Sequence, residues 1–200
     1  MTSHRNHTSI PAPSGISFET IATPRLDLVA VTAESLLCQV GFGPNFRVEL
    51  GAILDAEVPE GWPHENWEPH VLDYLLDLFA VTPESSGWCR YLILRGTDKR
   101  TLIGTFGSSI PKPETGEAEI GYGLLPDWQR QGLAAEAVVA MLPWLETQRT
   151  IRAFVAQTFP HLRGSIRVLE KTGFQQVGPG FEDGAILFRR ECGGARPTSP

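Results

Sequence analysis

The chain has 200 residues, 42% of them hydrophobic, which suffices for one domain with a well-filled core. Its 23 acidic and 17 basic side chains give a formal net charge of −6, which is compatible with a cationic or amine substrate. The charge argues against a nucleic acid as the main partner, because nucleic-acid-binding proteins usually carry a basic excess. No apolar run approaches the ~20 residues that a membrane span needs, so no membrane partner is expected.

The two ends of the chain differ in composition from the rest. Residues 1–16 and 191–200 are polar and rich in proline or glycine, so we expect flexible tails around a single domain at residues 17–190. The N-terminal segment lacks the apolar core of a secretory signal. The three cysteines show no paired spacing, so we expect reduced thiols and a cytoplasmic location.

The first part of the domain predicts a strand, a weakly patterned stretch and a helix. Residues 25–31 alternate as a strand, and Thr32 follows as the N-cap of a short helix, with Ser35 as a partial capping-box match. Residues 41–61 contain four glycines and predict only short helical pieces and loops. Residues 71–79 predict an amphipathic helix that needs a sheet to lie on.

Strands and helices continue along the rest of the chain. Further strands are predicted at residues 88–95, 101–110, 117–125, 151–158 and 185–190, and helices at residues 133–145 and 165–172. The helix at 133–145 is apolar nearly all round, so it should be buried against the sheet, and Pro143 should kink it or start its last turn. Gly173 stands at the usual end position of the final helix.

The segment Gln-Arg-Gln-Gly-Leu-Ala at residues 129–134 leaves a predicted strand and opens a predicted helix. Such a turn directs several unpaired backbone N–H groups and the positive end of the helix dipole at one spot, which suits a phosphate. Gly132 lets the backbone approach the anion, and Ala134 keeps the next position clear. The segment lacks the Lys-Ser/Thr of a P-loop and the three glycines of a dinucleotide-binding turn.

Together with its surroundings, this segment resembles the pyrophosphate loop, Gln/Arg-x-x-Gly-x-Gly/Ala, of the GNAT acetyltransferases. Residues 20–26 resemble the Glu-Thr-x-Arg-Leu opening of the ribosomal-protein N-acetyltransferase-like branch, and residues 119–124 resemble its fourth strand. Residues 131–137 resemble its loop and helix start, and residues 165–174 are similar to its Ser-x-x-Val-Leu-Glu-Lys-x-Gly-Phe block. The pieces occur in the order and spacing of the branch.

The resemblance implies a single GNAT-fold domain of the α/β class, with a twisted mixed sheet flanked by helices. Strands 4 and 5 of that sheet would splay apart to hold the pantetheine arm of acetyl-CoA, the co-substrate. The implied coenzyme-binding residues are Leu124, Leu125, Gln129, Arg130, Gln131, Gly132, Leu133, Ala134 and Ser165. No metal is expected, because His64 and His70 have no partner at metal-ligand spacing.

The implied reaction is direct transfer of an acetyl group to a primary amine. An ammonium must lose a proton before it attacks the thioester, and a carboxylate can accept that proton. Glu119 is the preferred base, and Glu117 lies about 7 Å away on the same strand face, on the acceptor side. Salt bridges or simple solvation are the alternatives for both carboxylates. The backbone around Leu124 is the implied oxyanion donor.

Two positions depart from the family pattern. Leu162 stands where the branch carries Asn, and Leu169 stands where many GNAT enzymes carry the Tyr that protonates the departing thiolate. The expected proton donor is therefore Ser165, His161 or water. A helix cap is the alternative role for Ser165, and a polar surface position is the alternative for His161.

Three aromatic residues, Trp62, Trp67 and Tyr74, are expected to line the acceptor pocket or else to belong to the core. The favoured function is an N-acetyltransferase acting on a protein N-terminus or a small-molecule amine. The alternative is a catalytically weak GNAT-fold protein that binds acyl-CoA as a sensor or interaction module. The acceptor and the oligomeric state stay open, with a homodimer among the expectations.

Overall fold

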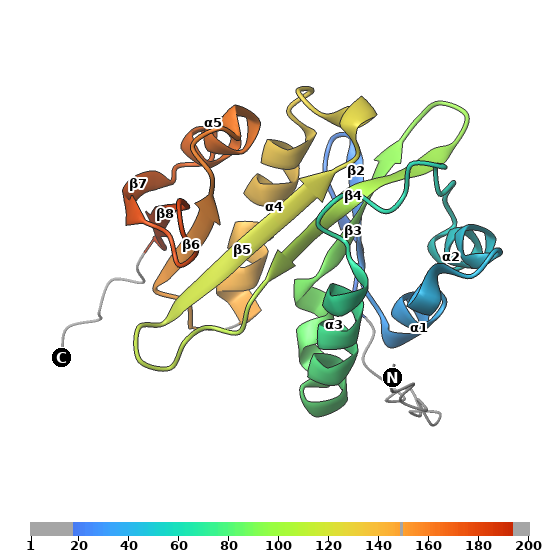
Figure 1. Ribbon diagram of the computed structural model, residues 1–200, viewed down its shortest axis with the longest axis horizontal. Helices are drawn as coiled ribbons and strands as arrows, with labels where there is room; N and C mark the ends of the chain where they lie inside the picture. Colours follow the sequence, from blue (N-terminus) through green and yellow to red (C-terminus); the bar gives the residue numbers. More distant parts are fainter. Residues whose placement is uncertain (1–17, 149, 194–200) are drawn as a thin grey trace.

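An eight-stranded mixed sheet runs through the computed structural model, which describes residues 18–148 and 150–193 (Figure 1). The strand order is β1-β2-β3-β4-β5-β6-β8-β7, and every pairing is antiparallel except that of β5 with β6. The strands are β1 (Ile21–Ala22), β2 (Leu26–Ala30), β3 (Arg90–Arg95), β4 (Arg100–Ser108), β5 (Glu117–Leu124), β6 (Ala153–Thr158), β7 (Gln175–Pro179) and β8 (Ile186–Glu191).

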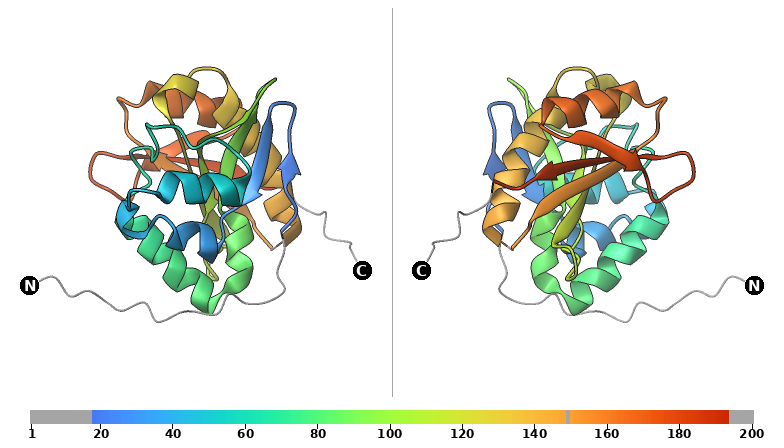
Figure 2. Two further views of the ribbon diagram at one scale, coloured as in Figure 1. Left: turned by 90° about the vertical axis from the view of Figure 1, so that its right-hand side faces the viewer. Right: turned by 90° about the vertical axis from the view of Figure 1, so that its left-hand side faces the viewer.

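Helices cover both faces of this sheet, as the two views of Figure 2 show. The α-helices are α1 (Ala33–Leu37), α2 (Phe46–Leu54), α3 (Pro69–Val81), α4 (Leu133–Gln148) and α5 (Arg163–Lys171), and the 3₁₀-helices are η1 (Val40–Phe42), η2 (Pro83–Trp88) and η3 (Pro126–Trp128). One buried cluster lies between the sheet and α4 and α5, and the other lies between the sheet and α1, α2 and α3. Because successive side chains of a strand point to opposite faces of the sheet, the strands contribute residues to both clusters.

The parallel pair β5–β6 is short. Its register joins residues 117–119 of β5 to residues 153–155 of β6, and the two strands separate beyond that point (Figure 1). β5 and β6 correspond to the predicted strands 4 and 5, because the two-residue strand β1 was not predicted from the sequence. The prediction of a splayed mixed sheet in one α/β domain is confirmed.

The predicted elements are present with shifted ends. The helix predicted at 71–79 begins two residues earlier because Pro69 occupies its first turn, where proline is tolerated. Trp88 belongs to η2 rather than to the strand that follows it. The helix at 133 continues through Pro143 to Gln148, and its face is less completely buried than expected, since Val139 is 59% exposed.

Three further expectations need correction. Thr32 and Ser35 form a complete, reciprocal capping box rather than a partial one. Strand β7 was missed, because four of its five residues are exposed and it contains Gly178 and Pro179, so no apolar alternation marks it. Strand β8 extends to Glu191, one residue into the predicted C-terminal tail. The N-terminal tail at 1–16 and residues 194–200 lie outside the described residues.

Candidate functional site

The open edge of β5 is the first component of the site. Ser109 N–H donates to the Glu119 carbonyl and Leu125 N–H donates to the Ile103 carbonyl, each at 2.8 Å. Odd-numbered residues of β5 thus bond to β4, and even-numbered residues direct their N–H and C=O groups toward β6. Because β6 has separated there, the backbone N–H of Leu124 faces the opening between the two strands.

A turn after β5 forms the second component. Gln129 Nε2 donates to the Leu124 carbonyl at 2.9 Å, and Gln131 Nε2 donates to the Asp127 carbonyl at 3.0 Å, so the turn is held by its own side chains. Arg130 (φ 59°) and Gly132 (φ 79°) both adopt left-handed backbone conformations. For Arg130 this conformation is strained, whereas for glycine it has no steric cost.

The turn leaves a group of free backbone donors, which we call the N–H nest: the N–H groups of Gly132, Leu133 and Ala134. The first backbone bond of α4 is made by Glu136 N–H to the Gly132 carbonyl at 3.0 Å, and the N–H groups of Gly132, Leu133 and Ala134 form no hydrogen bond within residues 18–148 and 150–193. Three converging N–H groups at the positive end of a 16-residue helix suit a phosphate.

The predicted coenzyme-binding residues divide into two groups. Gln129, Arg130, Gln131 and Gly132 are exposed on the turn. Leu125, Leu133 and Ala134 are buried, so their side chains anchor the turn in the core and only backbone groups can face a ligand. The N–H of Leu125 is already bonded to β4, so of these two leucines only Leu124 has a free backbone donor.

The predicted base lies on the other face of β5. Ala118 and Ile120 point into the core under α4, so the alternating residues Glu117 and Glu119 point to the face that carries α1–α3. Glu117 forms an ion pair with Arg189 Nε at 2.9 Å. Glu119 has no cation partner within 4 Å among the described residues, and its Oε1 accepts a hydrogen bond from Gln157 Nε2 at 3.2 Å.

Gln157 was not identified from the sequence. Its Oε1 accepts the backbone N–H groups of Phe181 (3.1 Å) and Glu182 (3.4 Å), so its amide orientation is determined by chemistry and its Nε2 must face Glu119. The β7–β8 loop is therefore tied through Gln157 to the predicted base. Lys112 Nζ lies 4.6 Å above the Phe181 ring, which brings the β4–β5 loop to the same place.

His64 is a second residue that sequence reasoning missed. It lies against β5 at Gly123, where a Cβ would stand 2.4 Å from its ring, beside the free N–H of Leu124. Its Nδ1 accepts the Asn66 N–H at 3.3 Å, so its Nε2 carries the proton and donates to Thr105 Oγ1 at 2.8 Å. Burial lowers the pKa of His64 to about 4, so the ring is neutral at physiological pH. The glycine in a strand pattern at position 123 was the available sequence signal.

The structure does not bring the three predicted acceptor-pocket aromatics together. Trp62 and Trp67 are buried, and both indole N–H groups donate to Gln39 Oε1 at 3.0 Å. Tyr74 is 60% exposed on α3. The two tryptophans therefore support the segment that carries His64, and the pocket role of all three stays a prediction.

The residues expected to protonate the thiolate also occupy different surroundings. Ser165 lies in the first turn of α5, and the N-cap is Leu162, so the alternative of a helix cap for Ser165 is wrong. The Tyr122 hydroxyl donates to the Ser165 carbonyl at 3.2 Å and lies 3.4 Å from its Oγ. Burial raises the pKa of Tyr122 to about 12, so its hydroxyl keeps its proton. His161 is exposed and stacks on Phe159, and Leu169 is buried in the core.

Two negative findings apply to the described residues. No cluster of three His, Cys, Asp or Glu side chains in them is arranged to hold a metal ion. No helix among them has the length and apolarity to cross a membrane. The cytoplasmic location stays a prediction.

Known proteins resemble this chain in sequence and in fold. The profile of the family described as acetyltransferase (GNAT) domain matches residues 49–175. The uncharacterized N-acetyltransferase p20 of Bacillus licheniformis is 33% identical over 87 residues, which are 44% of this chain and 48% of p20. The [ribosomal protein uS5]-alanine N-acetyltransferase of Escherichia coli (strain K12) is 27% identical over 89 residues, 44% of this chain and 46% of that protein. The matches thus span about half the length of these relatives.

A solved structure extends the likeness over most of the chain. RimL, a ribosomal L7/L12 alpha-N-protein acetyltransferase in complex with coenzyme A, superposes with a TM-score of 0.57 at 17% identity, covering 86% of this chain and 98% of RimL. At that identity the likeness concerns the fold. The family profile covers more than half of the chain and includes the β5 edge, the turn and the N–H nest, so the chain belongs to the GNAT acetyltransferase family.

Proposed function

We propose that this protein transfers an acetyl group from acetyl-CoA to a primary amine by direct attack in a ternary complex. The observation that carries the proposal is the N–H nest next to the open edge of β5, with Glu119 on the same strand. An anion site, a free strand edge and a carboxylate without a cation partner are what a phosphate-bearing thioester and a protonated amine require together.

On the coenzyme side, the N–H nest would hold the diphosphate, and the exposed Arg130 would add a cation beside it. The free edge of β5 would pair with the amide groups of the pantetheine arm, as an added strand does. The Leu124 N–H would then stabilise the oxyanion that forms on the thioester carbonyl. His64, against Gly123, would keep this part of β5 in place.

On the acceptor side, Glu119 would take one proton from the ammonium. The free amine attacks the carbonyl carbon, the C–N bond forms, and the C–S bond breaks with its electron pair on sulfur. The amide nitrogen loses a second proton and the thiolate gains one, so the net reaction releases one proton. Glu119 fits the role of base better than Glu117, because Glu117 is engaged by Arg189.

Ser165 is the better supported proton donor to the thiolate. It is half-buried and its hydroxyl lies next to that of Tyr122, which reaches from β5 to α5. His161 is exposed, and among the residues that the structure describes it forms no hydrogen bond or ring contact with β5 or β6. Because neither hydroxyl is acidic, we propose that Ser165 passes a proton from water rather than acting as a strong acid.

The acceptor is a protein N-terminus or a small-molecule amine. The E. coli relative that matches 44% of this chain is named for alanine acetylation of a ribosomal protein, which favours a peptide amine. The alternative is an acyl-CoA sensor with weak catalysis. It draws support from Leu169, which is buried and stands where many GNAT enzymes carry the tyrosine that protonates the departing thiolate.

A panel of amines separates the two functions. Purified protein is incubated with acetyl-CoA and each acceptor in turn: peptides with different first residues, polyamines and amino acids. Thiol release and mass spectrometry of the products are measured. We expect acceptor-dependent thiol release and a product heavier than the acceptor by one acetyl group in place of one hydrogen. Coenzyme binding without any acceptor-stimulated release would instead support the sensor.

A further inference from the structure

The β1–β2 turn is bound to the first turn of α4 by hydrogen bonds and an ion pair. Glu136 Oε1 accepts hydrogen bonds from Thr23 Oγ1 at 2.6 Å and from the Arg25 backbone N–H at 2.8 Å, and its Oε2 forms an ion pair with Arg25 Nε at 2.7 Å. Burial raises the pKa of Glu136, but the hydrogen bonds from Thr23 and Arg25 outweigh burial and hold the pKa below its usual value. Glu136 is therefore a charged carboxylate with both oxygens engaged.

Arg25 also reaches the turn that forms the N–H nest. Its Nη1 donates to the Gln131 carbonyl at 3.0 Å, and its Nη2 lies 3.6 Å from the place where a Cβ would stand on Gly132. A trans peptide directs its C=O and N–H in opposite directions. By holding the Gln131 carbonyl on its own side, Arg25 fixes the direction of the next N–H, that of Gly132, which is the first donor of the nest.

The charge of Arg25 has a second effect. Glu136 lies one turn from the nest, and an uncompensated carboxylate at that distance would repel a phosphate. The Arg25 guanidinium neutralises it, and Arg25, Glu136 and Gly132 all line one open hollow of about 550 Å³. The pair is thus close enough to a bound phosphate for its net charge to matter.

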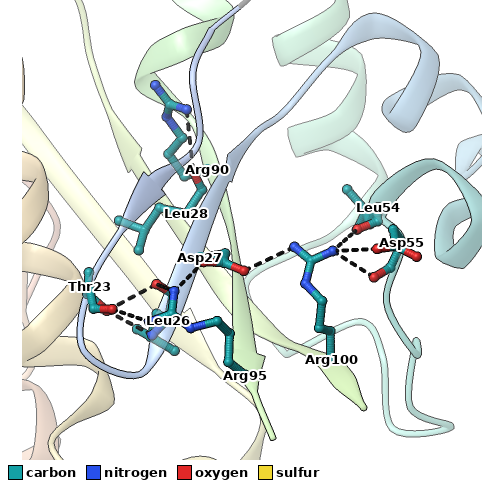
Figure 3. A network of polar contacts seen from close by, with 9 residues as sticks. All are labelled: Thr23, Leu26, Asp27, Leu28, Leu54, Asp55, Arg90, Arg95 and Arg100. Atoms are coloured by element: carbon teal, nitrogen blue, oxygen red, sulfur yellow. Dashed lines mark hydrogen bonds and ion pairs between the residues drawn. The ribbon is translucent and has the colours of Figure 1, made fainter. Parts of the chain in front are cut away.

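Side chains of β3 and β4 hold the β1–β2 turn, which carries Arg25, in place (Figure 3). Arg95 of β3 donates to the Thr23 carbonyl and forms an ion pair with Asp27. Asp27 also pairs with Arg100 of β4 at 3.2 Å. The sheet therefore holds the turn against α4.

We propose that Arg25 and Glu136 form a preset brace that positions the N–H nest for the phosphates of acetyl-CoA. Both are positioning residues, and the inference rests on the proposed function only in taking the nest as the coenzyme site. Because the brace acts on the loop and not on the reacting atoms, its loss raises the KM for acetyl-CoA and leaves kcat nearly unchanged.

The test is a double-mutant cycle read by calorimetric titration with coenzyme A, which needs neither an acceptor nor turnover. Arg25→Gln is expected to weaken binding roughly 10- to 100-fold, because charge-assisted bonds to the Gln131 carbonyl and to Glu136 are lost and the carboxylate is left uncompensated. Glu136→Gln is expected to cost less, since it removes the repelling charge together with the ion pair. In Arg25→Gln/Glu136→Gln the loss should be smaller than in Arg25→Gln alone. Additive losses would overturn the brace.

Controls separate this inference from the proposed function. Lys99→Gln removes one positive charge from an exposed pair with Glu57 and should stay within about twofold of wild type. Arg25→Gln should lose a similar factor with 3′-dephospho-coenzyme A, which keeps the diphosphate, and an unchanged affinity for that ligand would overturn the inference. If Arg25→Gln does not fold, Arg25→Lys, which keeps the charge but cannot bind Glu136 and the Gln131 carbonyl at the same time, should show an intermediate loss. Wild-type affinity in Arg25→Gln or Arg25→Lys would overturn the inference alone, whereas failure of the wild type to bind coenzyme A would overturn the proposed function.

Discussion

Glu119 and Glu117 stand on the same face of β5, but their surroundings differ. Glu117 is paired with Arg189, whose pKa is raised by the hydrogen bonds that it donates to Glu117 and Glu191. The Glu119 carboxylate accepts a hydrogen bond only from the neutral amide of Gln157 among the described side chains. The carboxylate without a cation is the one able to accept a proton from an approaching ammonium.

We therefore predict that Glu119→Gln lowers kcat/KM roughly 10²- to 10⁴-fold, the usual effect of removing a positioned acid–base group. The variant keeps the shape of the side chain, so the Kd for coenzyme A should hardly change. The rate should recover at higher pH, where free amine is abundant. Steady-state kinetics over a pH series measure both effects. Glu117→Gln is the matched control, and a Glu119→Gln rate within about threefold of wild type at neutral pH would mean that Glu119 is not the base.

Two substitutions of Gly132 distinguish the effect of a negative charge at the nest from the effect of backbone strain. Gly132→Glu should abolish coenzyme A binding, because a carboxylate would stand beside the phosphate site. Gly132→Ala is the matched control for backbone strain: φ is 79°, so any side chain is disfavoured, but a methyl group would meet only Arg25 Nη2 at 3.6 Å. We expect a modest loss for Ala and no measurable binding for Glu by calorimetry. Similar affinities for the two variants would show that the nest is not the phosphate site.

At the scale of elements, local patterns were enough to predict most of the fold, including the turn at 129–134. They were not enough for contacts between distant segments. Arg25 and Glu136 are 111 positions apart, and Gln157 and Glu119 are 38 apart, so no periodicity links them. His64 was considered only as a metal ligand, because nothing local shows that it packs on Gly123. The residues that position the site are the ones that tertiary structure alone reveals.

One such contact joins three elements through a single buried amide. Gln39 Oε1 accepts the indole N–H groups of Trp62 and Trp67, and its Nε2 donates to the Ser35 carbonyl and to the Tyr91 hydroxyl. Gln39 is fully buried, and its Oε1 is the acceptor for both buried indole N–H groups. The amide links the segment after α1, the segment that carries His64, and β3.

Replacing this amide should therefore destabilise the domain. Gln39→Leu keeps the volume but leaves two buried indole N–H donors unsatisfied, at about 1–3 kcal/mol each. We expect the free energy of unfolding to fall by roughly 2–5 kcal/mol in urea titrations. Gln176→Leu, on the exposed strand β7, is the matched control and should change stability by less than about 0.5 kcal/mol. A Gln39→Leu protein as stable as the control would show that the network contributes little.

At the scale of the whole molecule, the neutral His64 couples stability to pH. Burial lowers its pKa from 6.5 to about 4, so the folded state resists a proton that the unfolded state accepts. Stability from this residue is fully present above pH 6.5 and is lost as the pH falls toward 4, below which both states are protonated. The difference of about 2.5 pH units corresponds to roughly 3 kcal/mol.

We predict that the free energy of unfolding falls more steeply between pH 7 and pH 4 for the wild type than for His64→Gln. Glutamine cannot titrate and can still donate to Thr105 Oγ1, so the variant keeps the hydrogen bond and loses the linkage. Glu136 weakens both proteins alike at the acid end of the range. Its pKa is lowered in the folded state, so its contribution to stability is lost only as the pH falls below the usual pKa of a glutamate. The informative quantity is therefore the difference between the two urea titration series, which should shift by about 3 kcal/mol in favour of the variant. A difference that does not depend on pH would show that His64 titrates normally in the folded protein, and that the segment against Gly123 is open to water.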